Sequence, residues 1–356
     1  MSKVTFNNRN SVFTDALRAA ANEYFASRNM KKTGNFQLHL KTVLILAGAV
    51  GLYLTLMLGQ FPVWFSLILC YLFGMNLAFI GFNIMHDANH GSYSTKAWVN
   101  ELFGLTMNAL GSNAFIWRQK HNIIHHTYTN VDGIDDDIAN LPFVRSCYSQ
   151  PWNPMHRYQH LYMVPLYGLA TILWVFYTDF TKYFNRKIHN TALQAMPLKE
   201  HLIFWFSKVM YLTFYVGLPI YVHGFLPWMV GFLVMHAGLG ITMMTVFQLA
   251  HVVEEAEFDH VELDETKKIE TEWAIHQIRT TCDFAVHNKV LTWFLGGLNF
   301  QVVHHLFPRV SHVHYPALQK IVEQTCKQFG VQYHKFPTFG AALRSHFRMM
   351  YQLGRG

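Results

Sequence analysis

Two long stretches without any formally charged side chain constrain this chain more than any other feature. Residues 42–85 contain no Asp, Glu, Lys or Arg over 44 positions, and residues 209–253 contain none over 45. As a helix, each stretch would be roughly 66 Å long, about twice the ~30 Å hydrocarbon core of a bilayer. Each stretch is therefore expected to cross a membrane twice and to turn between the two crossings.

A turn signal lies near the middle of each stretch. The first contains GQFP at residues 59–62, and the second contains HGFLP at residues 223–227. Glycine and proline at these places interrupt a helix. The pattern predicts two hairpins of membrane-spanning helices, with four spans at about 42–59, 63–85, 205–222 and 228–250.

The basic residues indicate how the hairpins are oriented. All 28 Lys and Arg residues lie outside the two turns, and seven of them precede the first span. By the positive-inside rule, both termini are expected in the cytoplasm of a multi-pass integral membrane protein, and a bacterial inner membrane is favoured over the endoplasmic reticulum. The net charge of +7 then reflects orientation and attraction to anionic lipid, so no nucleic-acid partner is expected.

One further segment, residues 158–178, also carries no formal charge over its 21 positions. A crossing there would move the four basic residues between 182 and 199 to the outer face and would reverse the rest of the chain. We therefore expect an interfacial helix, broken near Pro165. Residues 103–116 predict a second helix that lies at the membrane face.

The two ends of the chain are expected to be cytoplasmic parts of one membrane protein. Residues 1–41 are polar and amphipathic, which predicts a cytoplasmic segment and no secretory signal. Residues 42–356 predict a single membrane domain. Its part after about Glu254 is expected to form a cytoplasmic cap.

Histidines are clustered in three short motifs. They are His86 and His90 in HDANH, His121, His125 and His126 in HNIIHH, and His304 and His305 in QVVHH. Residues four apart on a helix share one face, so His86 can converge with His90, and His121 with His125. Adjacent histidines are rotated by about 100° on a helix and so face neighbouring sites.

The predicted topology brings all three motifs to one side of the membrane. His251 ends the fourth span on that same side and is the eighth candidate. Neutral imidazole is a common metal ligand. A structural zinc site is satisfied by four ligands, whereas eight imidazoles predict two metal ions with open positions, as O₂ activation requires. Soluble di-iron bundles use paired Glu-x-x-His motifs, and no such pair of motifs is found here.

These motifs resemble those of the integral-membrane fatty acid desaturases, specifically the front-end or linoleoyl-CoA desaturase-like branch. The resemblance covers most of the chain and rests on HDANHGS, on WRQKHNIIHHTYTN followed by DDDI, and on GGLNFQVVHHLFP. It implies a non-haem di-iron centre that uses O₂ and two electrons to introduce a cis double bond into an acyl chain. The expected fold is an all-α integral membrane protein with four transmembrane helices in two hairpins, interfacial helices and a cytoplasmic cap that carries the His-rich di-metal site.

The resemblance also assigns roles to single residues. The expected iron ligands are His86, His90, His121, His125, His126, His251, His304 and His305. Gln301, at a position where many relatives have histidine, is expected to take part in catalysis by orienting a water or a ligand. The substrate is expected to be a fatty acyl-CoA or an acyl-lipid in the membrane.

The source of the electrons is expected to be external. The first 40 residues contain neither a cytochrome b5 domain nor its His-Pro-Gly-Gly motif. A separate ferredoxin, cytochrome b5 or flavin reductase is therefore implied as donor, docked on the basic cytoplasmic face.

Two other functions stay open at this point. An acyl or alkane hydroxylase, or a carotenoid oxygenase, would have the same ligand spacing, although Gln301 favours desaturation. A histidine-lined metal transporter would place ionisable residues at mid-membrane depth, whereas the histidines here gather at the interface.

Several residues near the motifs have two interpretations. Asp87, Asn299 and the run Asp135–Asp137 either fix imidazole tautomers or serve as surface and capping residues. Trp117 and Trp293 either line an acyl tunnel or anchor the protein at the membrane surface, and the second is favoured. Three further histidines are not expected to be ligands: His236, His312 and His314.

Overall fold

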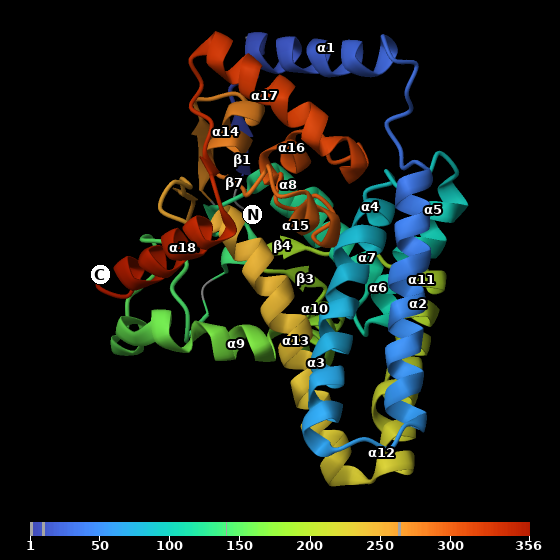
Figure 1. Ribbon diagram of the computed structural model, residues 1–356. Helices are drawn as coiled ribbons and strands as arrows, with labels where there is room; N and C mark the ends of the chain where they lie inside the picture. The colour runs from blue at the N-terminus through green and yellow to red at the C-terminus, as the bar shows by residue number, and fades with distance from the viewer. Residues whose placement is uncertain (1–2, 9–10, 140, 263–264) are drawn as a thin grey trace.

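The computed structural model describes residues 3–8, 11–139, 141–262 and 265–356. This part of the chain is mostly helical, as the sequence predicts. Long helices run lengthwise on one side of the molecule, and shorter helices gather at one end of them (Figure 1). The helices within the long apolar segments are α2 (Phe36–Leu58), α3 (Val63–Ile80), α9 (Gln159–Leu173), α11 (Leu198–Tyr211) and α13 (Phe225–His251).

Both predicted turns are confirmed. Helix α2 ends at Leu58 and α3 begins after Pro62. Helix α11 continues through a π-helical turn, η7 (Leu212–Gly217), into α12 (Leu218–His223). Gly224 then adopts φ +82°, a left-handed conformation that glycine tolerates, and α13 starts at the next residue. The two hairpin tips lie together at the bottom of Figure 1.

Close backbone contact joins the two hairpins. A Cβ atom added at Gly74 of α3 would lie 1.9 Å from the carbonyl oxygen of Met235 on α13, and one added at Gly238 would lie 2.4 Å from that of Tyr71. Only glycine allows helices to approach this closely. This contact fixes α3 against α13, the two helices that run up to His86 and His251.

Five helical segments of the described chain are long and apolar enough to cross a membrane, and they do not confirm the predicted count of four. They are Phe36–Leu58, Val63–Asn89, Pro154–Asn185, Leu198–His223 and Phe225–His251. The third contains α9, η6 (Trp174–Thr178) and α10 (Asp179–Asn185), and α9 runs crosswise to α3 and α13 in Figure 1.

Two other segments differ from their predicted helices. Helix α9 continues through Pro165, so the predicted break there is wrong; proline removes one backbone hydrogen bond, which the packed helix tolerates. Residues 103–116 do not form one helix. They are divided among α5 (Ala97–Gly104), α6 (Thr106–Ala109) and α7 (Ala114–Arg118), because Gly111 has φ +93° and Asn113 caps a new helix.

The cap is built from short elements of the N-terminal and C-terminal parts. Helix α1 (Val12–Ala26) lies across the top of Figure 1 beside α17 (Tyr315–Phe329), and its buried face includes Phe13 and Leu17. The other cap helices are α14 (Trp273–Arg279), α15 (Lys289–Phe294), α16 (Gln301–Leu306) and α18 (Phe339–Leu353).

The described residues also include strands, so the all-α expectation needs a small correction. Four two-stranded sheets pair short segments of two to four residues, because extended loop ends that meet in the cap satisfy each other's backbone groups. The pairs are β1 (Lys3–Phe6) with β6 (Thr266–Ile269), β2 (Val131–Asp132) with β5 (Asp259–His260), β3 (Lys187–Ile188) with β4 (Thr191–Ala192), and β7 (Asp283–Phe284) with β8 (Lys335–Phe336).

Candidate metal centre

The eight predicted histidines come from four separate parts of the fold and meet in its interior. His86 begins α4 (His86–Asn89) and His90 follows it. The second motif occupies η3 (Gln119–His125) and the start of α8 (His126–Tyr128). His251 is the last residue of α13, and the third motif lies on α16. All eight side chains are buried.

Two of these motifs are shaped by π-helical turns. The turn η2 (Gly81–Met85) directly precedes His86, and η3 contains His121 and His125. π-helical turns are frequent at functional sites. Here one lies directly before the first motif and the other within the second.

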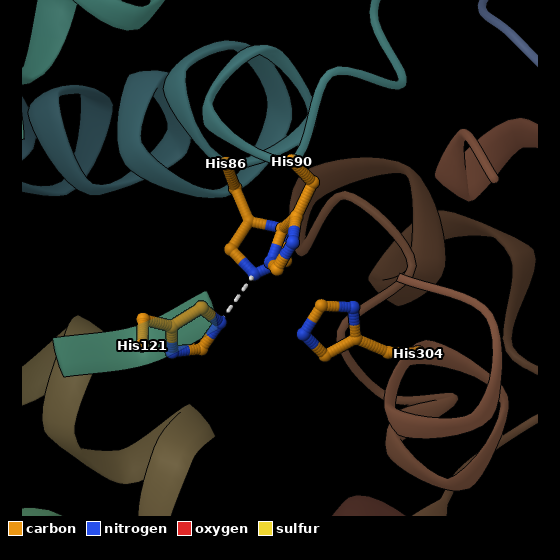
Figure 2. Close-up of side chains that lie close together, drawn as sticks. All are labelled: His86, His90, His121 and His304. Atoms are coloured by element: carbon orange, nitrogen blue, oxygen red, sulfur yellow. Dashed lines mark hydrogen bonds between the residues drawn. The ribbon is translucent and has the colours of Figure 1, made fainter. Parts of the chain in front are cut away.

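Four histidines form the first group. They are His86, His90, His121 and His304, and each offers one ring nitrogen that lies within 4.8 Å of those of the others. Figure 2 shows these imidazoles pointing toward a common centre from three different elements. The Nε2 atoms of His86 and His121 are 3.3 Å apart. This spacing suits nitrogen atoms that surround one ion.

A second group lies directly beside the first. It consists of His125, His251 and His305, whose candidate ligand nitrogens lie within 4.8 Å of one another. His126 lies between the groups: its ring centroid is 4.5 Å from that of His304 and equally far from that of His305. The expected divergence of adjacent histidines is therefore found for His304 and His305.

The expected convergence is found for both pairs, although the second pair also joins the two groups. His86 and His90 share the first group. His121 and His125 have candidate ligand atoms within 4.8 Å of one another, together with Asp137, while His121 also belongs to the first group and His125 to the second. Their rings lie nearly parallel with centroids 5.4 Å apart. They belong to a π-helical turn rather than to the α-helix that the prediction assumed, and each ring faces a different set of partners.

Several ring nitrogens around the two centres have no hydrogen-bond partner among the described residues. Buried ring nitrogens without a hydrogen bond are His90 Nε2, His125 Nε2, His126 Nδ1, His304 Nε2, His305 Nε2 and both nitrogens of His251. Buried polar atoms are rarely left unsatisfied in proteins. A metal ion at each centre would satisfy most of them, so the donor set fits two ions.

The protonation states agree with this interpretation. Burial lowers the pKa of His121, His304 and His305 well below the usual value of 6.5, and neighbouring histidines lower it further. These three imidazoles are therefore neutral at physiological pH, which is the form that binds metal.

Groups behind the imidazoles hold them in place. Asp135 accepts from Nδ1 of His125 at 3.0 Å. The side-chain oxygen of Gln277 lies 2.9 Å from Nδ1 of His305, and the hydroxyl of Tyr315 lies 3.1 Å from Nδ1 of His304. Such partners fix the tautomer and leave Nε2 free for the metal.

Asp135 fixes the tautomer of a histidine, which is one of the two predicted interpretations of the acidic run. Burial by itself lowers the pKa of His125, but the carboxylates of Asp135 and Asp137 raise it above its usual value. Asp136 and Asp137 also pair with Lys120, at 3.5 and 2.5 Å. The acidic run thus joins the second group to a partly buried ion-pair network.

Two other predicted supporting residues lie elsewhere. Asp87 accepts from the hydroxyl of Ser311 at 2.6 Å and lies 3.0 Å from Nδ1 of His312, so it links the first motif to the segment after the third. Asn299 bonds to the loop around Phe284. Sequence reasoning missed Gln277 and Tyr315, because no local motif marks a residue that becomes a neighbour only through the fold.

Comparison with known proteins decides the family. Residues 62–337 match the family described as Fatty acid desaturase, which is more than half of the chain. The chain belongs to the fatty acid desaturase family.

Named relatives of this desaturase agree with the family. It is 36% identical to the sn-1 linoleoyl-lipid 6-desaturase of Arthrospira platensis, over 97% of this chain and 93% of that protein. It is 35% identical to a protein of the same name from Synechocystis sp., over 96% of each chain. The acyl-lipid (8-3)-desaturase of Physcomitrium patens is 36% identical over 97% of this chain and 72% of its own.

The predicted family and activity are therefore confirmed. The chain is an oxidoreductase that desaturates acyl chains, and the transporter and hydroxylase interpretations are set aside. It is an integral membrane protein, as its apolar helices predict.

A tryptophan closes one side of the desaturase centre. Trp117 is 3% exposed, and its ring stacks on His121 with centroids 4.3 Å apart and planes 21° apart. The favoured interpretation of Trp117 as an anchor at the membrane surface is therefore wrong. Trp293 is 40% exposed and remains compatible with that role.

Gln301 begins the helix that carries the third motif. It is 1% exposed, and its side-chain nitrogen has no hydrogen-bond partner in the described chain. On α16 it lies one turn before His304 and His305, and so on the same helix face. Gln301 therefore lies on the face of α16 that carries two of the predicted ligands.

Proposed function

We propose that this desaturase holds two non-haem iron ions between its eight histidines and uses O₂ to introduce a cis double bond into the acyl chain of a membrane lipid. The observation that carries the proposal is the pair of adjacent histidine groups with inward-facing, unpaired nitrogens. Imidazole suits iron, and two neighbouring sites with open positions suit O₂ activation. The relatives named as acyl-lipid and linoleoyl-lipid desaturases support a lipid-linked substrate over an acyl-CoA.

The overall reaction balances with one O₂ and an external reductant. Two adjacent methylene groups each lose one hydrogen, a π bond forms between their carbons, and O₂ with two electrons and two protons becomes two waters. When bound, the iron pair would supply the redox chemistry that activates O₂ for removal of hydrogen from an unactivated carbon. The electrons come from a separate ferredoxin, cytochrome b5 or flavin reductase, for which we propose the basic cytoplasmic face as docking site.

The protein residues contribute position and shielding. Asp135, Gln277 and Tyr315 keep three imidazoles in fixed orientations, so the metal sites do not have to reorganise during turnover. The ring of Trp117 covers His121 and keeps bulk water away from that side. Gln301 is proposed to orient a water or to bind weakly, because a neutral amide is a poorer ligand for iron than imidazole.

Lipid analysis tests the chemistry. Cells that express the protein should accumulate a fatty acid with one more double bond, found in glycerolipids before it appears in the acyl-CoA pool. The purified protein should contain about two irons by inductively coupled plasma analysis. A hydroxylated product, or one tightly held zinc with no activity after iron loading, would refute the proposal.

We further propose the four-span arrangement, with α9 at the membrane interface and the termini and the histidine centre in the cytoplasm. The crosswise course of α9 in Figure 1 supports an interfacial position. Membrane-impermeant reagent should label a cysteine placed at Gly224 from outside and should not label one at Lys187. External labelling at Lys187 would show that the segment containing α9 crosses the membrane.

A further inference from the structure

A large apolar cavity lies at the opposite end of the helix bundle from the histidine centre. It has a volume of about 580 Å³ and is bounded by α2, α3, η7, α12, α13 and the two hairpin tips. Gln60 and His223, at the two hairpin tips, are among the residues that line it. We call it the hairpin cavity. Its size is typical of a ligand site in a protein.

The residues that line the hairpin cavity are mostly apolar. Two of its polar side chains are bonded to backbone: the hydroxyl of Tyr53 donates to the carbonyl oxygen of Phe214 at 2.8 Å, and the indole nitrogen of Trp228 donates to that of Tyr215 at 2.8 Å. Both carbonyls belong to the π-helical turn η7. Apolar cavities take apolar ligands.

The cavity is separate from the histidine centre. From Phe73 and Met235 at its inner end, α3 and α13 run on for 13 and 16 residues before His86 and His251. This corresponds to roughly 20 and 24 Å of helix.

Close helix packing also lies at the inner end of the cavity. The backbones of α3 and α13 touch there at Gly74 and Gly238.

The surroundings point to the occupant. Every helix that lines the cavity belongs to a candidate membrane span, and the outer faces of these helices are apolar. The ligand available there in quantity is the hydrocarbon chain of a bilayer lipid. We propose that the hairpin cavity binds one acyl chain of a phospholipid, with the headgroup at the hairpin tips near Gln60 and His223.

A photoreactive phospholipid tests the proposal. A phosphatidylglycerol with a diazirine in one acyl chain is added to the purified full-length protein, and crosslinks are mapped by mass spectrometry. Crosslinks are expected on residues 53–73 and 214–235. Cys70→Trp fills the cavity, since Cys70 lines it beside Gly231, and should reduce these crosslinks to background.

A matched variant on the same helix controls for the added indole. Ile68 is 48% exposed and does not line the cavity, so Ile68→Trp should crosslink like the wild type. Equal crosslinking of the Cys70→Trp and Ile68→Trp variants would overturn the proposal. The crosslinked wild-type protein should still desaturate its substrate. If activity instead falls in proportion to the crosslinked fraction, the cavity belongs to the substrate site and the proposal is overturned.

A second measurement uses the unmodified chain and does not depend on the folding of a variant. Cys70 is partly exposed, whereas Cys147, Cys282 and Cys326 are buried. Pyrene-maleimide should react with Cys70 in delipidated protein, and added phosphatidylglycerol should slow this reaction. A reaction rate that phospholipid leaves unchanged would refute occupancy of the cavity.

Discussion

Replacement of Gln277 by leucine removes the hydrogen-bond acceptor behind one of the proposed iron ligands. The side chain is fully buried, and its oxygen lies 2.9 Å from Nδ1 of His305 and 2.8 Å from the hydroxyl of Thr129. Leucine has a similar size but no acceptor. His305 then loses the partner that fixes its tautomer and ring orientation.

The size of the effect follows from these contacts. A buried donor left without a partner costs about 1–3 kcal/mol, and loss of a group that supports a metal ligand typically lowers metal affinity or activity by about 10- to 100-fold. The hydroxyl of Thr129 stays 3.1 Å from Nδ1 of His305 and can replace part of the lost interaction. We therefore expect a loss at the lower end, about tenfold in iron affinity and in desaturated product.

A matched control separates this effect from general destabilisation. Gln159 is equally buried and bonds to the backbone of Arg145 and Met350, with no hydrogen bond to the histidines. Gln159→Leu should lower the melting temperature but leave the iron bound per folded molecule unchanged.

The assays are iron titration of the purified variants, gas chromatography of fatty acid methyl esters from expressing cells, and thermal melting. The reasoning is refuted if Gln277→Leu binds iron and forms product as well as Gln159→Leu does at the same folded fraction.

Three further outcomes are expected. His121→Ala should abolish iron binding and product but leave membrane insertion intact, which fractionation of membranes would check. Gln301→His should retain iron and part of the activity, whereas Gln301→Leu should lose most product; full activity of the leucine variant would show that the amide has no role. Burial raises the pKa of Asp283 to about 7, although Tyr333 and the backbone N–H of Val302 donate to it. Because this folded pKa exceeds the unfolded one, stability from this group falls as pH rises from about 4 to 7, and Asp283→Asn should flatten the decline of melting temperature over that range.

Much of the topology could be read from the sequence because the bilayer imposes a local rule. A segment in hydrocarbon has to be helical, apolar and about 20 residues long, and these properties are visible along the chain. Both hairpin turns followed from this rule. The segment around α9 was harder to interpret, because length and hydropathy do not say whether an apolar helix crosses the membrane or lies along it.

The histidines of the centre were also visible in the sequence, because metal chemistry demands a particular residue type at short spacings. All eight lie in the two groups or between them, including His251, which no short motif contains. Their division was not visible. Which ring faces which centre depends on π-helical turns and on the contact between α16 and the other motifs, and both are decided by packing across the whole chain.

Only the tertiary structure decided what surrounds the ligands. Gln277 and His305 are 28 positions apart, and Trp117 became a wall of the centre instead of an anchor at the membrane surface. Hydropathy and motif spacing are local properties, so they specify membrane helices and metal-binding residue types. The partners of a buried side chain depend on which distant segments the packed fold brings together. The hairpin cavity likewise exists only because two separate hairpins, which touch at Gly74 and Gly238, line it together.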